Sequence, residues 1–407
     1  MKTSRRKPHL SGELSSTTGR NTRPKTSEDG RGNALPIPTD LIIEIFTRLP
    51  LKSIAICRCV SKTWSSLLRR SDFTELFLSL SKSCTLSRLL LAYQKGRDLF
   101  FFSAPQPQNP DENSSPVVAT YHMKFSFHAC LLGSFKLSGL DHGLVGLTST
   151  WIGKGREPPL VPMMCNPSTG QSLLLPRVKT KRVKAMSLFG YDPIDKQVKV
   201  LSMPVSQGSV LPVAEEYQVV TLGTGKLSQR MINCGRELCY YPHLRGKCIN
   251  GVLYYPSIDM STESHVLVCF DVRSEKFNFI KVDKFFTEGT MINYNGKLGL
   301  VWSEGWLSRN SRSVNLCVLE DIEKQEWSKH VYVLPALWED IVGRALLSFV
   351  GMTRTNEIVM RSLSPLYLFY FNTEKNTVVR VEIEGLDLSE YTRVHIFLDH
   401  VENVTLM

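Results

Sequence analysis

The sequence repeats a pattern about every 50 residues, and this repeat limits the possible folds more than any other feature. Each unit contains short runs of β-forming residues, with a polar turn between two of the runs. The turns lie at Asn109, Asn166, Thr221, Asp271, Glu320 and Asn372. The steps between them are 57, 55, 50, 49 and 52 residues. A unit of this length with two hairpin turns predicts a four-stranded repeat, and such repeats can pack radially as a β-propeller.

A second set of turns falls within the same units. Asn250-Gly251 and Asn295-Gly296 are the strongest of them. Both dipeptides favour type I′ hairpin turns, because Asn and Gly adopt the positive φ that these turns require. Weaker turn signals in similar places are Gly143 and Asn356. A further turn is expected at Lys95-Gly96, between two β-forming runs.

We therefore expect residues 86–407 to form an all-β, propeller-like domain of about six four-stranded repeats. The last apolar segment, Arg393–Leu406, would return to complete the first repeat and close the ring. A β-sandwich or an irregular stack of strands is the alternative. Either would explain the strands, but neither would explain the period.

Residues 1–34 have a different composition from the rest of the chain. Their hydrophobic residues are Met1, Leu10, Leu14 and Ala34. They hold eight Lys or Arg against three Asp or Glu, so five of the net +11 charges lie here. Such a segment buries too little apolar surface to offset the entropy of ordering, and we expect a disordered basic tail.

Residues 35–78 carry more apolar surface than a small helical unit needs. On a helical wheel of residues 40–49 the apolar side chains cover an arc of about 200°, twice the stripe of a typical surface helix. Pro50 ends this helix, and a second apolar run follows at Ser53–Val60. A third helical face contains Trp64, Leu67 and Leu68. Three short helices cannot cover this surface alone, so it needs a partner protein or the rest of the chain.

The segment LPIPTDLIIEIFTRLPLKSIAICRCVSKTWSSLLRRSDF resembles an F-box in several fixed spacings at once. It departs mildly at Val60-Ser61-Lys62, where the family often has Val-Cys-Lys. The resemblance implies a substrate receptor of a Skp–cullin–F-box ubiquitin ligase, whose F-box binds the Skp adaptor. The residues expected to bind Skp are Leu35, Pro36, Leu41, Ile42, Ile45, Leu49, Pro50, Leu51, Ile54, Cys57, Val60 and Trp64. Trp64 is also expected in the F-box core.

Phrases from about Asp141 to past Asn372 resemble the F-box-associated domain of plant F-box proteins, a kelch-like family. They include GLVGL, CNPSTGQSLLLP, FGYDPIDKQVKVLSM, INGVLYY and LVCFDVRSEKFNFIKV, in the family's order. In that family the domain holds the target protein. The overall expectation is an α+β multidomain chain: a tail (1–34), a three-helix F-box (35–78) and a propeller-like, substrate-binding domain (86–407).

The sequence contains no recognisable catalytic or metal-binding pattern. Its ten cysteines include no Cys-x-x-Cys pair, so neither a zinc RING nor disulfides are expected. Buried free thiols indicate a reducing compartment, the cytoplasm or the nucleus. No apolar run reaches the ~18 residues of a membrane span. We expect a non-catalytic subunit without a cofactor or metal, with a Skp adaptor, a cullin and an unknown target protein as partners, and no membrane.

Two features could bind a target. Trp306 lies in a polar, loop-like segment, and aromatic residues often anchor protein interfaces. The segment Pro176–Lys184 has five basic residues and no acidic one, which gives Lys179, Lys181 and Arg182 as further candidates. The same segment and the tail support an alternative function, nucleic-acid binding. A third hypothesis, an enzyme that uses the propeller channel, has no supporting motif.

Overall fold

The structure is a computed structural model. It describes residues 37–83, 87–108, 110, 115–126, 135–140, 142–149, 162–176, 178, 184–205, 213–214, 217–223, 227–240, 246–283, 286, 288–362, 365–388 and 392–406. The chain divides into two units after Ile42, and each unit is described by itself. The expected disordered tail, residues 1–34, lies outside the described residues.

Four helices occupy residues 39–83, where three were expected. They are α1 (Thr39–Thr47), α2 (Leu51–Val60), α3 (Lys62–Leu67) and α4 (Ser71–Ser83). The third expected segment is divided into α3 and α4 by a turn at residues 68–70. Ser61 caps the start of α3, its hydroxyl accepting a hydrogen bond from the Trp64 amide at 3.1 Å. Phe73 and Phe77 then lie on the buried face of the separate helix α4.

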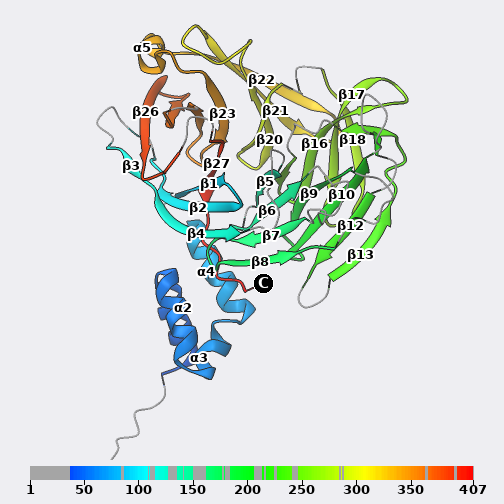
Figure 1. Ribbon diagram of the computed structural model, residues 1–407. Coiled ribbons are helices and arrows are strands. Elements are labelled where there is room, and N and C mark those ends of the chain that lie inside the picture. Colours follow the sequence, from blue (N-terminus) through cyan, green and yellow to red (C-terminus); the bar gives the residue numbers. More distant parts are fainter. Residues whose placement is uncertain are drawn as a thin grey trace, which may run out of the picture. The chain divides into compact units, whose positions relative to one another are not determined.

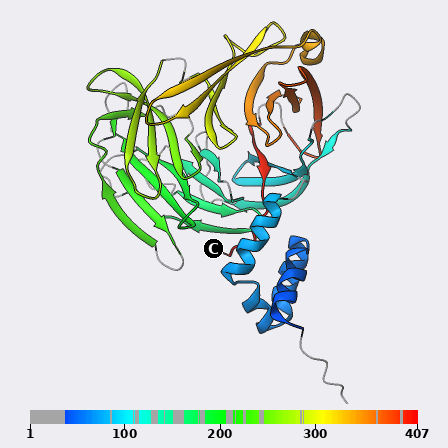
Figure 2. The same ribbon diagram turned by 180° about the vertical axis from the view of Figure 1, so that it is seen from behind.

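Residues 88–400 form six β-sheets arranged as the blades of a propeller (Figures 1 and 2). Blade 1 contains β27 (Val394–His400), β1 (Arg88–Lys95), β2 (Asp98–Pro105) and β4 (Thr120–Ser126). Blade 2 contains β5 (Phe135–Gly139), β6 (Val145–Ser149), β7 (Met163–Asn166) and β8 (Gln171–Leu174). Blade 3 contains β9 (Lys184–Asp192), β10 (Gln197–Val205), β12 (Tyr217–Leu222) and β13 (Leu227–Ile232).

The other three blades follow the same order. Blade 4 contains β11 (Val213–Ala214), β14 (Leu238–Tyr240), β15 (Lys247–Ile249), β16 (Val252–Asp259), β17 (Ser264–Asp271) and β18 (Phe277–Lys281). Blade 5 contains β19 (Thr290–Tyr294), β20 (Lys297–Trp302), β21 (Ser313–Asp321) and β22 (Glu326–Val333). Blade 6 contains β23 (Leu347–Met352), β24 (Glu357–Ser362), β25 (Tyr367–Asn372), β26 (Thr377–Glu384) and β3 (Val117–Val118). A fifth helix, α5 (Trp338–Val342), joins blades 5 and 6.

Most of the predicted turns occupy equivalent positions in the blades, and the predicted fold class is confirmed. The turn at Lys95-Gly96 is the exception, because β27 is the first strand of blade 1 and this turn therefore joins its second and third strands. Five of the six polar turns lie where the third strand of a blade ends and the fourth begins, and Asn109 lies outside the described residues. Asn250 and Gly251 have φ of 47° and 83°, and Asn295 and Gly296 have 49° and 84°. These values give the two type I′ hairpins that the Asn-Gly pairs predict.

The ring is closed by the last strand of the chain, as the sequence predicted. Strand β27 pairs antiparallel with β1, with Ala92 opposite His395 and Leu91 opposite Ile396. The chain then continues to blade 2, where the buried Asn166 side chain donates hydrogen bonds to the Asn403 and Thr405 carbonyls at 3.1 and 2.9 Å. The C-terminal segment therefore ties blade 1 to blade 2 as well as closing blade 1.

Connections of different lengths lie at the two ends of the blades. Strands within a blade are antiparallel, so links from the first to second and third to fourth strands lie at one end, which we call the tight-turn end. Links from the second to third strand, and from blade to blade, lie at the other, the long-loop end, which also holds the short turn between β1 and β2 of blade 1. The Trp306 segment (303–312) and the α5 segment (334–346) belong to the long-loop end.

The bonds from Asn166 predict a large loss of stability on substitution. Asn166→Ala removes both donors and leaves two carbonyls unpaired, so we expect the free energy of unfolding to fall by about 3 kcal/mol in urea titrations. Asn372→Ala is the matched control, because Asn372 ends β25 at the equivalent turn and its side chain accepts amide bonds from Glu374 and Lys375. It should cost about 1 kcal/mol. Equal losses in the two variants would contradict the tie between the C-terminal segment and blade 2.

The pH dependence of stability should carry a contribution from His142. Burial and then the nearby Lys82 charge, with Nζ 3.3 Å from Nε2, lower the His142 pKa to about 4. An unfolded histidine titrates near ~6.5, so the unfolded chain binds the proton first as pH falls. The free energy of unfolding should therefore decrease between about pH 6.5 and pH 4, and His142→Gln should lose about 2 kcal/mol less over that window. Parallel pH curves for the two proteins would contradict this assignment.

Candidate protein-interaction surfaces

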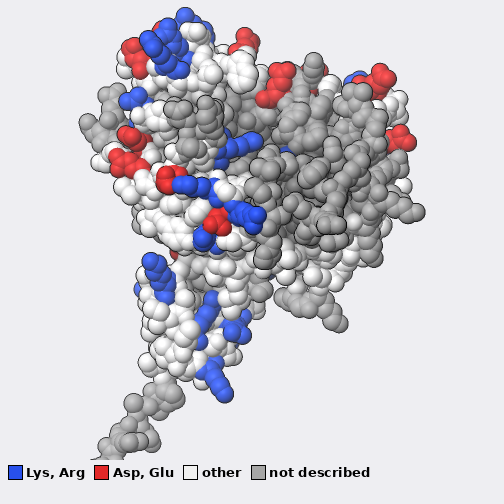
Figure 3. All heavy atoms as spheres, in the orientation of Figure 1, with Lys and Arg blue, Asp and Glu red and all other residues white. Residues whose placement is uncertain are grey.

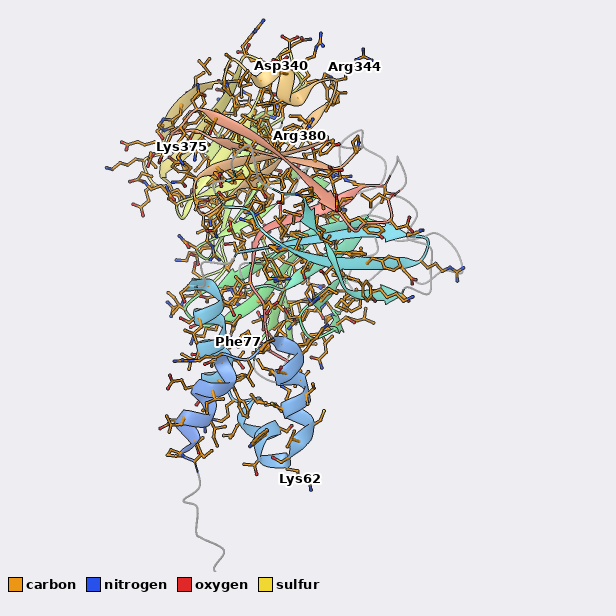
Figure 4. All side chains as sticks on the ribbon, turned by 90° about the vertical axis from the view of Figure 1, so that its left-hand side faces the viewer. Lys62, Phe77, Asp340, Arg344, Lys375 and Arg380 are labelled. Atoms are coloured by element: carbon orange, nitrogen blue, oxygen red, sulfur yellow. The ribbon has the colours of Figure 1, made fainter. Side chains whose placement is uncertain are left out.

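Helices α2 and α4 each leave a pair of apolar side chains exposed one turn apart. Ile56 and Val60 of α2 are 66% and 60% exposed, and Leu76 and Leu80 of α4 are 42% and 43% exposed. In α4 this exposed pair lies beside the buried Phe73 and Phe77, at i, i+3, i+4 and i+7 spacing, and Phe77 is labelled in Figure 4. In α2 the buried Ile54 lies on the side opposite Ile56 and Val60. Each helix therefore leaves part of its apolar surface directed to solvent.

The interior of the helical region explains how so short a segment can hold these faces in place. Ile54 and Leu68 are almost completely buried. Phe46 packs edge-on against Trp64, with ring centroids 5.1 Å apart. Aromatic pairs of this geometry add about 0.5–1.5 kcal/mol beyond the area that they bury.

The structure separates the predicted Skp-binding residues into groups. Exposed side chains are Leu41, Ile45, Pro50 and Val60. Half-buried side chains are Ile42, Leu49, Leu51, Cys57 and Trp64. Ile54 is only 1% exposed and belongs to the core, so it cannot contact a partner directly in this conformation. Leu35 and Pro36 lie outside the described residues.

Four exposed apolar residues of the helical region were missed by the sequence analysis. They are Ile37, Ile56, Leu76 and Leu80. Ile56 could have been found from its spacing of four residues from Val60, and Leu80 from the same spacing from Leu76. The helical wheel could not assign them, because α2 is apolar nearly all round and its buried side is chosen by tertiary packing.

Trp306 is the most exposed large apolar residue of the described propeller, at 84%. Its loop is held firmly, because the Trp338 indole donates to the Ser308 carbonyl at 2.9 Å and the Leu347 amide to the Leu307 carbonyl at 2.8 Å. Leu307 is buried, so Trp306 projects from an anchored turn. The other candidate residues for target binding, Lys179, Lys181 and Arg182, lie outside the described residues.

Charged side chains surround α5 at the same end of the blades. Lys and Arg gather there, with Asp and Glu beside them (Figure 3). Arg309 lies 3.7 Å from Glu339, and Figure 4 labels Asp340 and Arg344 near α5. This combination of an exposed indole and a charged rim of both signs is typical of a protein-binding surface.

In the part of the chain that the structure describes, no group of three or more His, Cys, Asp or Glu side chains could hold a metal ion. The eight described cysteines are free, and burial raises the pKa of Cys165 and Cys269 to about 12. Cys57 and Cys59 are less buried than expected. None of the described helices is long and apolar enough to cross a membrane.

Two family descriptions match the chain over the regions described above. The F-box domain matches residues 35–76, and the F-box associated beta propeller domain matches residues 88–401. The second match alone covers well over half of the sequence. The chain belongs to the F-box proteins with an F-box-associated β-propeller.

Similar F-box proteins occur in Arabidopsis thaliana. F-box protein DOR is 51% identical over 385 residues, which cover 92% of this chain and 95% of that protein. F-box protein At5g65850 is 45% identical over 403 residues, which cover 95% of each. These relatives show that the F-box and the propeller occur together in homologues of nearly the same length.

The assignment of Ile54 to the F-box core can be tested against Val60 of the same helix. Ile54→Ala should lower the free energy of unfolding by about 3 kcal/mol, because it opens a cavity. Val60→Ala should cost less than about 1 kcal/mol, because the side chain is 60% exposed. Urea unfolding followed by circular dichroism at the helical signal gives both values. A loss from Val60→Ala as large as that from Ile54→Ala would show that α2 packs differently.

Proposed function

We propose that this protein is a non-catalytic substrate-recognition adaptor of a Skp–cullin–F-box ubiquitin ligase. In this proposal the F-box binds a Skp adaptor and, through it, a cullin, while the propeller binds a target protein. The observation that carries the proposal is the set of exposed apolar side chains on the F-box helices. An F-box match combined with uncovered Ile and Leu side chains calls for an apolar partner at this position.

The energetics favour a stable interface on these helices. Ile45, Ile56 and Val60 are each more than half exposed. Covering a fully exposed Val or Ile contributes ~1.5–3 kcal/mol, and these side chains would gain a large part of that on binding. The half-buried Leu49, Leu51 and Cys57 would contribute less. Leu76 and Leu80 offer a further apolar stripe on α4.

The propeller's role in this proposal is to hold the target at its long-loop end. Trp306 is the proposed contact, because its exposed indole is preorganised by the bonds of Ser308 and Leu307. Binding a target beside a charged conjugating enzyme raises the effective concentration of its lysines, so the adaptor needs no reactive group of its own. The free cysteines support a reducing compartment, and we propose the cytoplasm or the nucleus.

A pull-down of the full chain with a purified Skp adaptor tests the proposal. Replacing Ile56 and Val60 together by Asp places two charges on the apolar face of α2, and Skp binding should fall at least tenfold. The matched control replaces Leu227 and Met231 by Asp, because these side chains are 48% and 43% exposed on β13 in blade 3. The control should bind Skp like the wild type.

Two outcomes would contradict the adaptor role. One is no binding of Skp by the folded wild-type chain. The other is unchanged binding by the Ile56 and Val60 variant while its circular dichroism spectrum matches that of the wild type. The second outcome would mean that the exposed stripe of α2 serves another purpose.

A further inference from the structure

Strand β22 is the outermost strand of blade 5 (Figure 1). Among the described residues, β21 is the only strand that pairs with it. About half of the backbone N–H and C=O groups of an edge strand point away from its one neighbour. An open edge of this kind is a template for pairing with another extended chain.

The adjacent blade shows the same edge position already occupied by an extended segment. Strands β22 and β26 each have eight residues and are the last strands of blades 5 and 6. The short strand β3 pairs in parallel with β26, with Val117 opposite Ile383 and Val118 opposite Glu384. The outer strands of blades 1 to 4 have seven, four, six and five residues. Of the two longest outer strands in the described propeller, one is therefore covered and the other is not.

The exposed side chains of β22 are suited to an apolar partner strand. Val331 and Val333 are 64% and 68% exposed, and they lie on one face because they are two residues apart. Lys329 provides the kind of charge that usually protects an edge, but residues 330–333 include no Lys, Arg, Asp, Glu or Pro. β-branched side chains opposite these valines would cover them and add cross-strand packing.

The other face of β22 holds the strand in place for such pairing. Tyr332 packs edge-on against Phe371 of blade 6, with centroids 6.3 Å apart, and stacks with His330 at the same distance. Trp327 lies on the same face as Val331 and Val333, near the start of the strand, and packs against Phe286 with centroids 5.4 Å apart. The strand is thus held on both faces before any partner arrives, which lowers the entropy cost of binding.

We propose that the outer side of β22 binds an extended segment of the target protein by strand addition. The segment would add a fifth strand to blade 5 and place β-branched or aromatic side chains over Val331 and Val333. Backbone hydrogen bonds would supply affinity, and the side chains at alternate positions would supply selectivity. The inference rests on the proposed function in one respect, because it takes the strand-adding partner to be the target protein.

A displayed library of random ten-residue peptides, selected against the full chain, provides the probe. The affinity of each selected peptide is then measured by fluorescence anisotropy against two variants. The first replaces Val331 and Val333 by Lys, which should weaken binding at least tenfold and leave the fold intact because both side chains are exposed. The second replaces Leu227 and Met231 by Lys on the outer strand of blade 3, and it should not change binding.

N-methylation of the peptide distinguishes strand addition from simple apolar contact. Methylating every second amide should abolish binding in one register and leave it unchanged in the other, because only alternate amides face the partner strand. The proposal would be overturned if the selected peptides bound the Val331 and Val333 variant as tightly as the wild type. It would also be overturned if methylation weakened peptide binding equally in both registers. A library that yields no binder would overturn it as well.

Two further measurements separate this proposal from its alternatives. If light scattering gives a dimer for the wild type and a monomer for the Val331 and Val333 variant, a second copy of the chain occupies the edge of β22. That result would overturn the proposal. Skp pull-downs of the same variants should match the wild type, so failure of the adaptor role and failure of this inference give different results.

Discussion

The antiparallel pairing of β27 with β1 is the contact on which the rest of the propeller depends. Each blade buries its apolar side chains against its two neighbours, and this cover is complete only in a closed ring. One cluster of buried residues, for example, joins blades 6 and 1 through Tyr370, Leu368 and Val394. The bonds of Asn166 to the C-terminal segment then fasten the closing strand to the next blade. A single strand thereby completes two blade interfaces.

Much of the fold could be predicted, because turns are determined locally. Asn250-Gly251 and Asn295-Gly296 adopt the φ angles that their residue types favour, wherever the strands eventually pack. The number of blades could be predicted from the period of about 50 residues, because each repeat carries its own local turns. The path of the chain within blade 4 and the addition of β3 to blade 6 could not be predicted, since both depend on pairing between residues far apart in the sequence.

The candidate interaction surfaces were predictable only in part. The excess of apolar residues in the F-box helices was visible in the sequence, but the side that each helix buries was not. Ile54 and Ile56 are nearly identical in type and differ by only two positions, yet one is buried and the other is 66% exposed. Tertiary packing selects between them, since Ile54 is buried like Leu68 and Phe73 and Ile56 is not. At the long-loop end, Trp306 could be placed in a loop, but its anchoring by Ser308 and Leu307 required the three-dimensional structure.

The position of the closing strand has a consequence for synthesis of the protein on the ribosome. The F-box helices and β1 emerge early, whereas β27 begins only at Val394 of 407 residues. Throughout most of translation, blade 1 therefore lacks its innermost strand, and the inner edge of β1 has no partner in the mature register. Nascent and C-terminally truncated chains would share this exposed edge, while the finished chain would not. Strand β27 thus provides a physical distinction between chains in which the ring is closed and chains in which it is not.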